Sequence, residues 1–180
     1  MRPLVVVFPL VVLAAAAGAQ QSHNTNAPID FGADRIELQD RQNRGVLSGN
    51  VAVKQAEMTL NAARMTVIYT GQVVGGNPQV ARLDAAGGVT VRRPDQTARS
   101  QYAVYDLNSR IITMLGNVSL TQGGGNTVNG GRLSINLDTG RAVIDGSSVR
   151  GAAPGSGGGN VTTAPSGRVT GTFSVPKRNN

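Results

Sequence analysis

The chain has 180 residues, a formal net charge of +7 and no cysteine. A chain of this length suits one domain with its own hydrophobic core, and the lack of cysteine excludes a fold stapled by disulfides. The basic balance would suit nucleic-acid binding, but only 3% of the residues are aromatic, so side chains that stack on bases are scarce. The composition therefore argues against nucleic acid as a partner.

The N-terminus has the pattern of an export signal. Residues 4–17 form an apolar run behind a single charge, Arg2, and residues 17–19 are small, as a cleavage site requires. A membrane-spanning helix needs about 20 apolar residues, and this run is shorter and contains Pro9. We therefore predict that residues 1–19 are a cleaved signal peptide rather than a membrane anchor.

Composition divides the remaining chain into four segments. Residues 20–27 are polar and hold the only histidine, His23, so we expect a disordered leader. Residues 28–150 carry the apolar patterning of a folded domain. Residues 151–167 contain six glycines and two prolines, typical of a linker. For residues 168–180 two alternatives stay open, a C-terminal strand with a basic tail or a disordered terminus.

One short motif recurs within the predicted domain. Gly49-Asn50-Val51 and Gly116-Asn117-Val118 are identical. Valines that stand one to three residues after a glycine recur at Val51, Val89, Val118 and Val149, at spacings of 38, 29 and 31 residues. Repeats at a near-constant spacing indicate one supersecondary unit stacked on itself. The longest spacing coincides with glycine-rich residues 71–78, which we expect to form an exposed loop.

Each repeat has the pattern of β-strands. Residues 133–137 alternate apolar and polar side chains, and no window long enough for a helix carries an apolar stripe free of glycine. We expect the strands to end at the turn signals Asn108-Ser109, Gly87-Gly88, Gly123-Gly124-Gly125, Asn129-Gly130-Gly131 and Asp138-Thr139-Gly140. Strands of this kind predict two facing sheets, in a jelly-roll or a flattened solenoid. The open edges would be residues 28–31 and either 142–145 or 168–175.

The ordered motifs resemble a known family. In chain order they are PIDFxADR at 28–35, LSGNVxVxQ at 47–55, LNAxR at 60–64, YDL at 105–107, LGNVxL at 115–120 and GGRL at 130–133. This set is similar to the OstA-like domain family of lipopolysaccharide-export bridge proteins and covers about residues 28–150. The resemblance implies an all-β, twisted antiparallel β-jelly-roll (OstA-like), here built from four strand repeats of about 30 residues and open at both ends.

The resemblance also implies a location and partners. It places the chain in the periplasm, where lipopolysaccharide would lay its lipid A acyl chains in an apolar gap between the sheets. Neighbours would be an inner-membrane-anchored LptC-like subunit, an outer-membrane LptD-like translocon and further copies of the chain, joined head to tail. The glycine-rich segment 151–167 departs from this pattern beside the C-terminal edge.

Candidate lipid-binding residues are the apolar side chains expected to face inward. They are Ile36, Leu38, Val51, Val53, Leu60, Met65, Val67, Tyr105, Leu107, Val118, Leu120, Leu133, Ile135 and Leu137, with Ile29 and Phe31 at the entrance on the N-terminal edge strand. The C-terminal edge strand would use Val143, Ile144, Val169, Phe173 and Val175. The same lining residues could instead pack a closed core. Arg92 and Arg93 fit an exposed hairpin tip better than a phosphate site.

The residues give no reason to expect catalysis. With one histidine and no cysteine there is no metal-ligand set and no nucleophile with its base, and a Walker-type phosphate loop is absent. We therefore expect a protein that is not an enzyme and uses no cofactor or metal. The alternative to lipid transport is a secreted structural or adhesive β-repeat protein with no lipid ligand.

Overall fold

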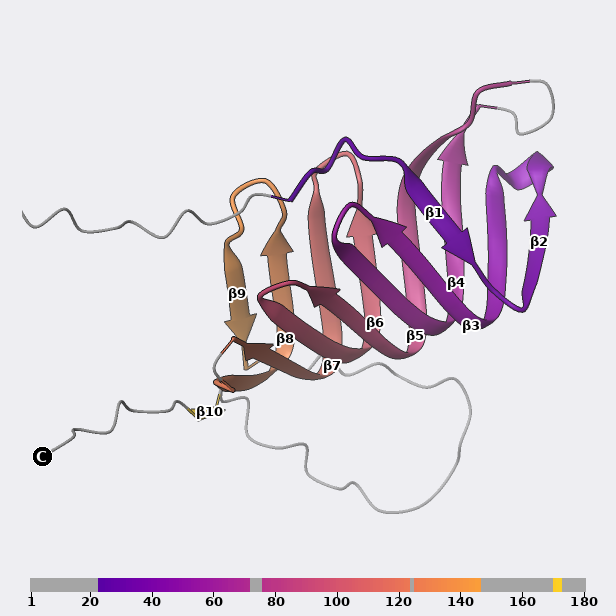
Figure 1. Ribbon diagram of the computed structural model, residues 1–180. Coiled ribbons are helices and arrows are strands. Elements are labelled where there is room, and N and C mark those ends of the chain that lie inside the picture. Colours follow the sequence, from indigo (N-terminus) through magenta and orange to yellow (C-terminus); the bar gives the residue numbers. More distant parts are fainter. Residues whose placement is uncertain (1–22, 72–75, 124, 147–169, 173–180) are drawn as a thin grey trace, which may run out of the picture.

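The computed structural model describes residues 23–71, 76–123, 125–146 and 170–172 (Figure 1). The predicted signal peptide and the glycine-rich linker lie outside these residues, as do Val149, Val169, Phe173 and Val175. In the described part of the chain, no helix has the length and apolarity to cross a membrane.

The described chain is almost entirely β-structure, with one 3-10 turn, η1. The elements are β1 Ile29–Gly32, β2 Arg35–Gln39, η1 Asp40–Gln42, β3 Arg44–Gln55, β4 Met58–Thr70, β5 Gln79–Arg93, β6 Gln96–Asp106, β7 Ile111–Gln122, β8 Thr127–Asn136, β9 Ala142–Asp145 and β10 Thr170–Thr172. They form one antiparallel ten-stranded sheet, in which β3 to β8 follow one another as neighbours in chain order. The all-β fold is confirmed.

The recurring motif forms a bend inside each odd-numbered long strand. Gly49 and Asn50 in β3, Gly87 and Gly88 in β5, and Gly116 and Asn117 in β7 all have positive φ. The strand pairing is interrupted at the same places, as at a β-bulge. Glycine adopts positive φ without strain, and asparagine tolerates it better than most residues. The repeat therefore encodes a row of aligned bends across the sheet.

Two of the predicted strand ends are wrong, one at a pair of glycines with positive φ and one at a pair without it. Gly87-Gly88 lies inside β5 and Gly130-Gly131 lies inside β8. Each was expected to be a turn because paired glycines commonly end strands, but the chain here bends and continues in the sheet. The tip at Arg92 and Arg93 is confirmed, since β5 ends at Arg93 and β6 begins at Gln96.

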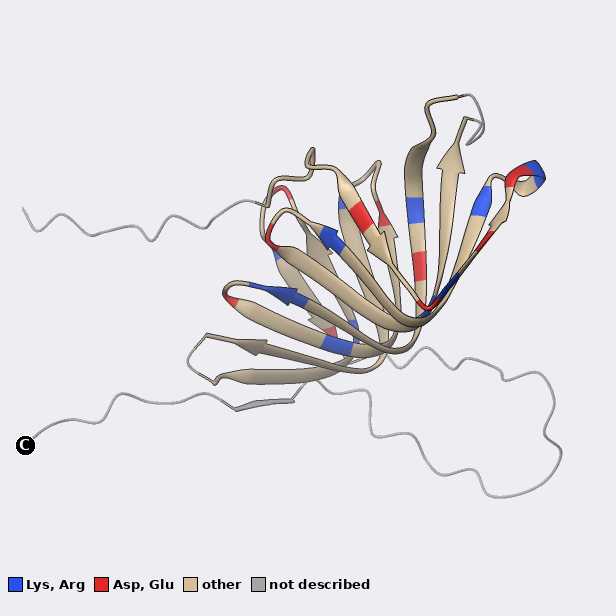
Figure 2. Cartoon of the chain, turned by 45° about the vertical axis from the view of Figure 1, so that its right-hand side comes forward, with Lys and Arg blue, Asp and Glu red and all other residues tan. Residues whose placement is uncertain are grey.

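The bends fold the sheet into two facing halves, which Figure 2 shows as a V. We call half A the side that ends in turns 56–57, 94–95 and 123–126, and half B the side that ends in η1 and in turns 107–110 and 137–141. In β4 the buried positions are Met58, Leu60 and Ala62, then Met65, Val67 and Tyr69. The alternation shifts by one residue at the bend, so that both halves turn an apolar face inward.

The two edges of the sheet are built alike. At one end β1 pairs with the half A part of β3 and β2 with its half B part. At the other end β10 pairs with the half A part of β8 and β9 with its half B part. Both predicted candidates for the C-terminal edge therefore contribute, at 142–145 and at 170–172, and the sheet stays open at both ends.

Candidate functional site: an apolar cavity at the N-terminal end

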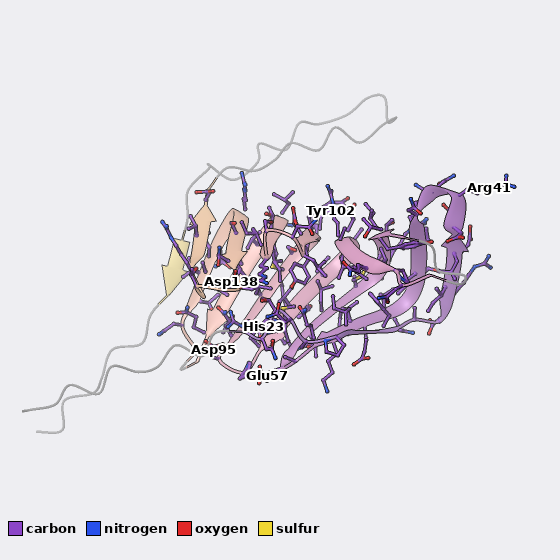
Figure 3. All side chains as sticks on the ribbon, turned by 90° about the horizontal axis from the view of Figure 1, so that it is seen from above. His23, Arg41, Glu57, Asp95, Tyr102 and Asp138 are labelled. Atoms are coloured by element: carbon purple, nitrogen blue, oxygen red, sulfur yellow. The ribbon has the colours of Figure 1, made fainter. Side chains whose placement is uncertain are left out.

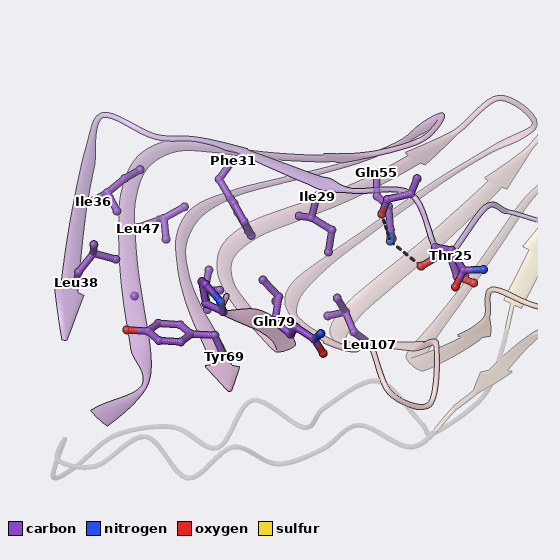
Figure 4. Close-up of a pocket in the computed structure, with 16 residues that line it drawn as sticks. Thr25, Ile29, Phe31, Ile36, Leu38, Leu47, Gln55, Tyr69, Gln79 and Leu107 are labelled. Atoms are coloured by element: carbon purple, nitrogen blue, oxygen red, sulfur yellow. Dashed lines mark hydrogen bonds between the residues drawn. The ribbon is translucent and has the colours of Figure 1, made fainter. Parts of the chain in front are cut away.

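A cavity of about 610 Å³ lies between the halves at the end formed by β1 and β2 (Figure 4). Its volume is in the range usual for small-molecule sites, about 300–1,000 Å³. Its walls come from β1 to β5, from the segment before β1 and from the chain just after β6. The lining residues are Thr25, Asn26, Ala27, Ile29, Phe31, Ile36, Leu38, Gly45, Leu47, Gln55, Val67, Tyr69, Pro78, Gln79, Val80 and Leu107.

The mouth of this cavity exposes apolar side chains. Ile36 is 52% exposed, Leu38 58% and Phe31 37%, and all three face the cavity (Figure 4). Single exposed apolar residues are ordinary on protein surfaces, but three around one concave opening form a patch that a ligand or partner could cover. The chemistry available here is the shielding of apolar groups from water.

One polar contact fixes the rim on the half B side. The Tyr69 hydroxyl donates to Asp40 Oδ1 of η1 at 3.2 Å. Burial of the ring and this hydrogen bond raise the pKa of Tyr69, so it stays a neutral donor. The contact holds η1 against the end of β4, beside the mouth.

The candidate lining residues fall into two groups. Ile36, Leu38, Val67 and Leu107 line the cavity, together with the entrance residues Ile29 and Phe31. The others lie in the packed interior, each at most 4% exposed: Val51, Val53, Leu60, Met65, Tyr105, Val118, Leu120, Leu133, Ile135 and Leu137. Val51 also lines a second, smaller cavity beside the bends, and contact of either group with a ligand stays a prediction.

The C-terminal edge residues are less buried. Val143 is 39% exposed, whereas Ile144 packs against the core. At this edge the Ile144 side chain approaches Gly130, where an added Cβ would lie 2.4 Å from Ile144 Cγ2. Gly130 therefore allows β9 to pack closely on β8.

The segment assigned to a disordered leader has defined contacts. We call residues 23–27 the strap. His23 is only 6% exposed, and its Nε2 lies 3.3 Å from Gln55 Oε1. The Gln55 amide donates to the backbone oxygens of Thr25, at 3.0 Å, and Ala27, at 3.1 Å. Disorder was expected because the strap is short and polar, and no local pattern points to Gln55 as its buried partner.

Tyr105 completes this polar cluster from the other half. Its hydroxyl donates to Gln55 Oε1 at 2.8 Å, which joins half B to half A. Burial raises the pKa of Tyr105 to about 12, although the bond to Gln55 opposes the shift. Burial also lowers the pKa of His23. Both groups are therefore neutral near pH 7, which suits an interior site.

No group of three or more His, Cys, Asp or Glu side chains in the described residues could hold a metal ion. The ion pairs of Arg82 with Asp84, both on β5, and of Arg110 with Asp138, in two turns of half B, lie at the surface. The described part of the site thus presents apolar walls and amide or hydroxyl groups.

The fold and cavity define a class of protein, an open-ended β-jelly-roll that can enclose apolar groups between its two halves. The model of the LptA/(LptD N-terminal domain) LPS transport protein family matches residues 31–141, from β1 to the residue before β9. The chain belongs to this family and is an LptA/OstA-like lipopolysaccharide transport protein, as the motifs predicted.

Two relatives are consistent with this assignment. An uncharacterised protein of Rhizobium meliloti is 30% identical over 145 residues, covering 76% of this chain and 78% of that protein. The crystal structure of LptH, the LptA-homologous periplasmic component of the lipopolysaccharide transport device of Pseudomonas aeruginosa, aligns with a TM-score of 0.66. The alignment covers 84% of this chain and 99% of LptH, at 19% identity, so it shows a shared fold.

Proposed function

We propose that the chain is a periplasmic bridge component that binds lipopolysaccharide and shields its lipid A acyl chains between the two halves of the sheet. An acyl chain of about 12 carbons in water costs on the order of 10 kcal/mol, at ~0.8 kcal/mol per methylene. A carrier must therefore cover most of that surface. The observation that carries the proposal is the cavity of about 610 Å³, with Phe31, Ile36 and Leu38 exposed at its mouth.

The two open edges support the second part of the proposal, transfer along a chain of similar domains. β1 and β2 form one edge, and β9 and β10 form the other. A free edge can pair with a strand of another domain through backbone hydrogen bonds. Head-to-tail pairing would place the apolar mouth against the next domain. In this arrangement the partners are further copies, an inner-membrane-anchored LptC-like subunit and an outer-membrane LptD-like translocon.

The family supplies the transport role, and the described residues offer no catalytic constellation that would compete with it. We infer that the chain is a passive conduit whose direction of transport is set by other components. The alternative, a structural or adhesive β-repeat protein, predicts that the cavity holds no lipid.

The test is purification of the mature protein from a lipopolysaccharide-producing host, followed by mass spectrometry of the co-extracted lipid. Wild type should carry lipopolysaccharide, whereas Ile36→Asp and Leu38→Asp should lose most of it. Both positions are more than half exposed, so these variants should keep their thermal stability. Tyr102→Asp, at a 55% exposed residue outside the cavity lining, is the matched control. Absence of lipid from wild type would favour the adhesive alternative.

A further inference from the structure

The strap lies along the open side of the V, opposite the row of bends. We call this open side the seam. Seen from above, His23 lies between Asp138 of half B and Glu57 of half A (Figure 3). The strap therefore runs between the tips of the two halves, and only then does the chain enter β1. Figure 1 shows the same path along the upper side of the sheet.

Side-chain contacts hold the strap to both halves. On half A, Gln55 Nε2 donates to the backbone oxygens of Thr25 and Ala27. On half B, the Thr25 hydroxyl donates to Asp138 Oδ1 at 3.2 Å, and Arg110 Nη2 donates to Asn26 Oδ1 at 3.1 Å. These contacts bridge the seam at the level of the cavity.

The strap is attached much more weakly than the strands. No residue of the strap belongs to a strand, and among the described residues its one hydrogen bond between two backbone groups, from Ala27 N to Asn24 O at 3.3 Å, is internal. Asn24 and Asn26 are exposed. Segments with few buried apolar contacts and solvent-exposed hydrogen bonds open locally at a lower free energy than the whole domain. The strap can thus leave while the sheet stays folded.

The strap is also a wall of the cavity, because Thr25, Asn26 and Ala27 line it. We propose that the strap is a releasable side wall anchored by Gln55, and that an apolar ligand enters the cavity sideways through the seam when the strap is released. The identity of that ligand as an acyl chain rests on the function proposed above. An amphiphile gains from this route, since its polar head can stay in water while its tail moves between the halves.

Thiol labelling measures the access of a maleimide reagent to the cavity and needs no lipid. The chain contains no cysteine, so the label reports only on a cysteine that is introduced. Leu107→Cys reports on the cavity wall near Thr25, and Leu38→Cys reports on the mouth at the far end (Figure 4). Each reporter is placed in wild type, in Gln55→Ala and in a Thr25→Ala, Asn26→Ala double variant. The double variant changes only strap side chains outside the core, so it remains informative if Gln55→Ala fails to fold. Thr121→Ala is the control: it removes a side-chain hydrogen bond to Thr127, 3.1 Å long, that lies outside both the cavity lining and the strap.

The double variant, which loses two hydrogen bonds, should raise the maleimide labelling rate at Leu107→Cys by about 5- to 30-fold. Gln55→Ala removes three contacts with the strap and should raise this rate at least as much. The labelling rate at Leu38→Cys in the strap variants, and both labelling rates in Thr121→Ala, should stay unchanged. Unchanged labelling at Leu107→Cys in the double variant would overturn the proposal, as would an equal rise at both reporters, which indicates general loosening.

Uptake of the fluorescent fatty acid cis-parinaric acid tests the entry route with an acyl ligand. Strap variants should take up the probe faster than wild type, and Thr121→Ala should match wild type. If no form binds the probe while labelling responds as expected, the acyl-binding function is wrong and the releasable strap stands. If the probe binds at equal rates in all forms, entry occurs at the end of the jelly-roll and the sideways route is wrong.

Discussion

Tyr105 and Gln55 form a direct hydrogen bond between the two halves of the sheet, 2.8 Å from the phenol oxygen to the amide oxygen. The two residues are 50 positions apart, and each is at most 2% exposed. Most buried residues of the described chain are apolar, so this pair places a specific polar contact between the halves. It also positions the amide that anchors the strap.

Tyr105→Phe should destabilise the fold by about 1–2 kcal/mol, because it leaves a buried acceptor with one partner fewer. Urea unfolding followed by far-UV circular dichroism measures the change. Tyr102→Phe is the control, since that hydroxyl is on a 55% exposed side chain and should matter little. Equal stability of the two variants would mean that the buried pair contributes nothing net.

The bends give a second prediction. Gly87 has φ +85°, and an added Cβ would lie 2.8 Å from the Ala63 Cβ on the neighbouring strand. Gly87→Ala should therefore destabilise the domain by about 1–3 kcal/mol, through strain at positive φ together with this clash. Gly32→Ala, where an added Cβ meets nothing within 4 Å, should stay within about 0.5 kcal/mol of wild type in the same unfolding assay.

Much of the fold could be predicted because its signals are local. The alternation in residues 133–137 specifies a strand face, and the repeated Gly-Asn-Val specifies a recurring special backbone. The meaning of that motif could not be read locally, because a paired glycine at positive φ can either end a strand or bend it. Only the neighbouring strands, which pair with β5 on both sides of Gly87-Gly88 with a shift of register between, decide for a bend.

The candidate site, like the fold, could be predicted only where its signals are local. Ile36 and Leu38 could be identified from alternation, and they line the cavity. The contacts of His23 could not, because Gln55 is 32 residues away and Tyr105 a further 50, and only the folded sheet brings them together. Nor could periodicity separate a packed interior residue such as Leu133 from one at the cavity, because both face inward.

The difference between packed interior residues and cavity residues gives a third prediction. Leu133 and Ile135 are at most 1% exposed, so Leu133→Asp and Ile135→Asp bury a charge and should cost several kcal/mol. We expect these variants to lose lipid binding by failing to fold, as seen in the loss of a cooperative thermal transition. Leu38→Asp should instead unfold like wild type. If Leu133→Asp or Ile135→Asp folds normally and still carries lipid, these residues do not belong to the lipid-binding interior.

The strap should weaken at acidic pH, which is the fourth prediction. Burial lowers the pKa of His23 below its ordinary value and the charge of Arg93 adds to this, whereas the hydrogen bond with Gln55 and the charge of Glu57 oppose it. The released strap therefore takes up a proton more readily than the bound strap. Its stability is complete above about pH 6.5, the unperturbed histidine pKa, and falls as the pH drops towards the lowered value.

Amide hydrogen exchange of the peptide that contains residues 23–28 measures this effect between pH 7.5 and 5, after correction for intrinsic exchange. Protection should decrease on acidification, while the core peptides of β4 and β7 keep theirs. His23→Asn is the matched control, and its strap protection should lose this pH dependence. If the strap keeps the same protection over this pH range, protonation of His23 does not favour release of the strap.

The C-terminal edge supports the fifth prediction. β10 covers β8 through only three pairs, Thr170 with Asn129, Gly171 with Val128 and Thr172 with Thr127. A chain ending at Gly146 keeps β9 on half B but leaves the half A part of this edge unpaired. An unpaired edge can accept another strand, so this shortened chain should self-associate more strongly than the full chain in sedimentation velocity. Lys substitutions at Thr127 and Asn129 should reverse the gain, since charged edge residues oppose strand addition. Equal association of the full and shortened chains would mean that β10 does not compete for this edge.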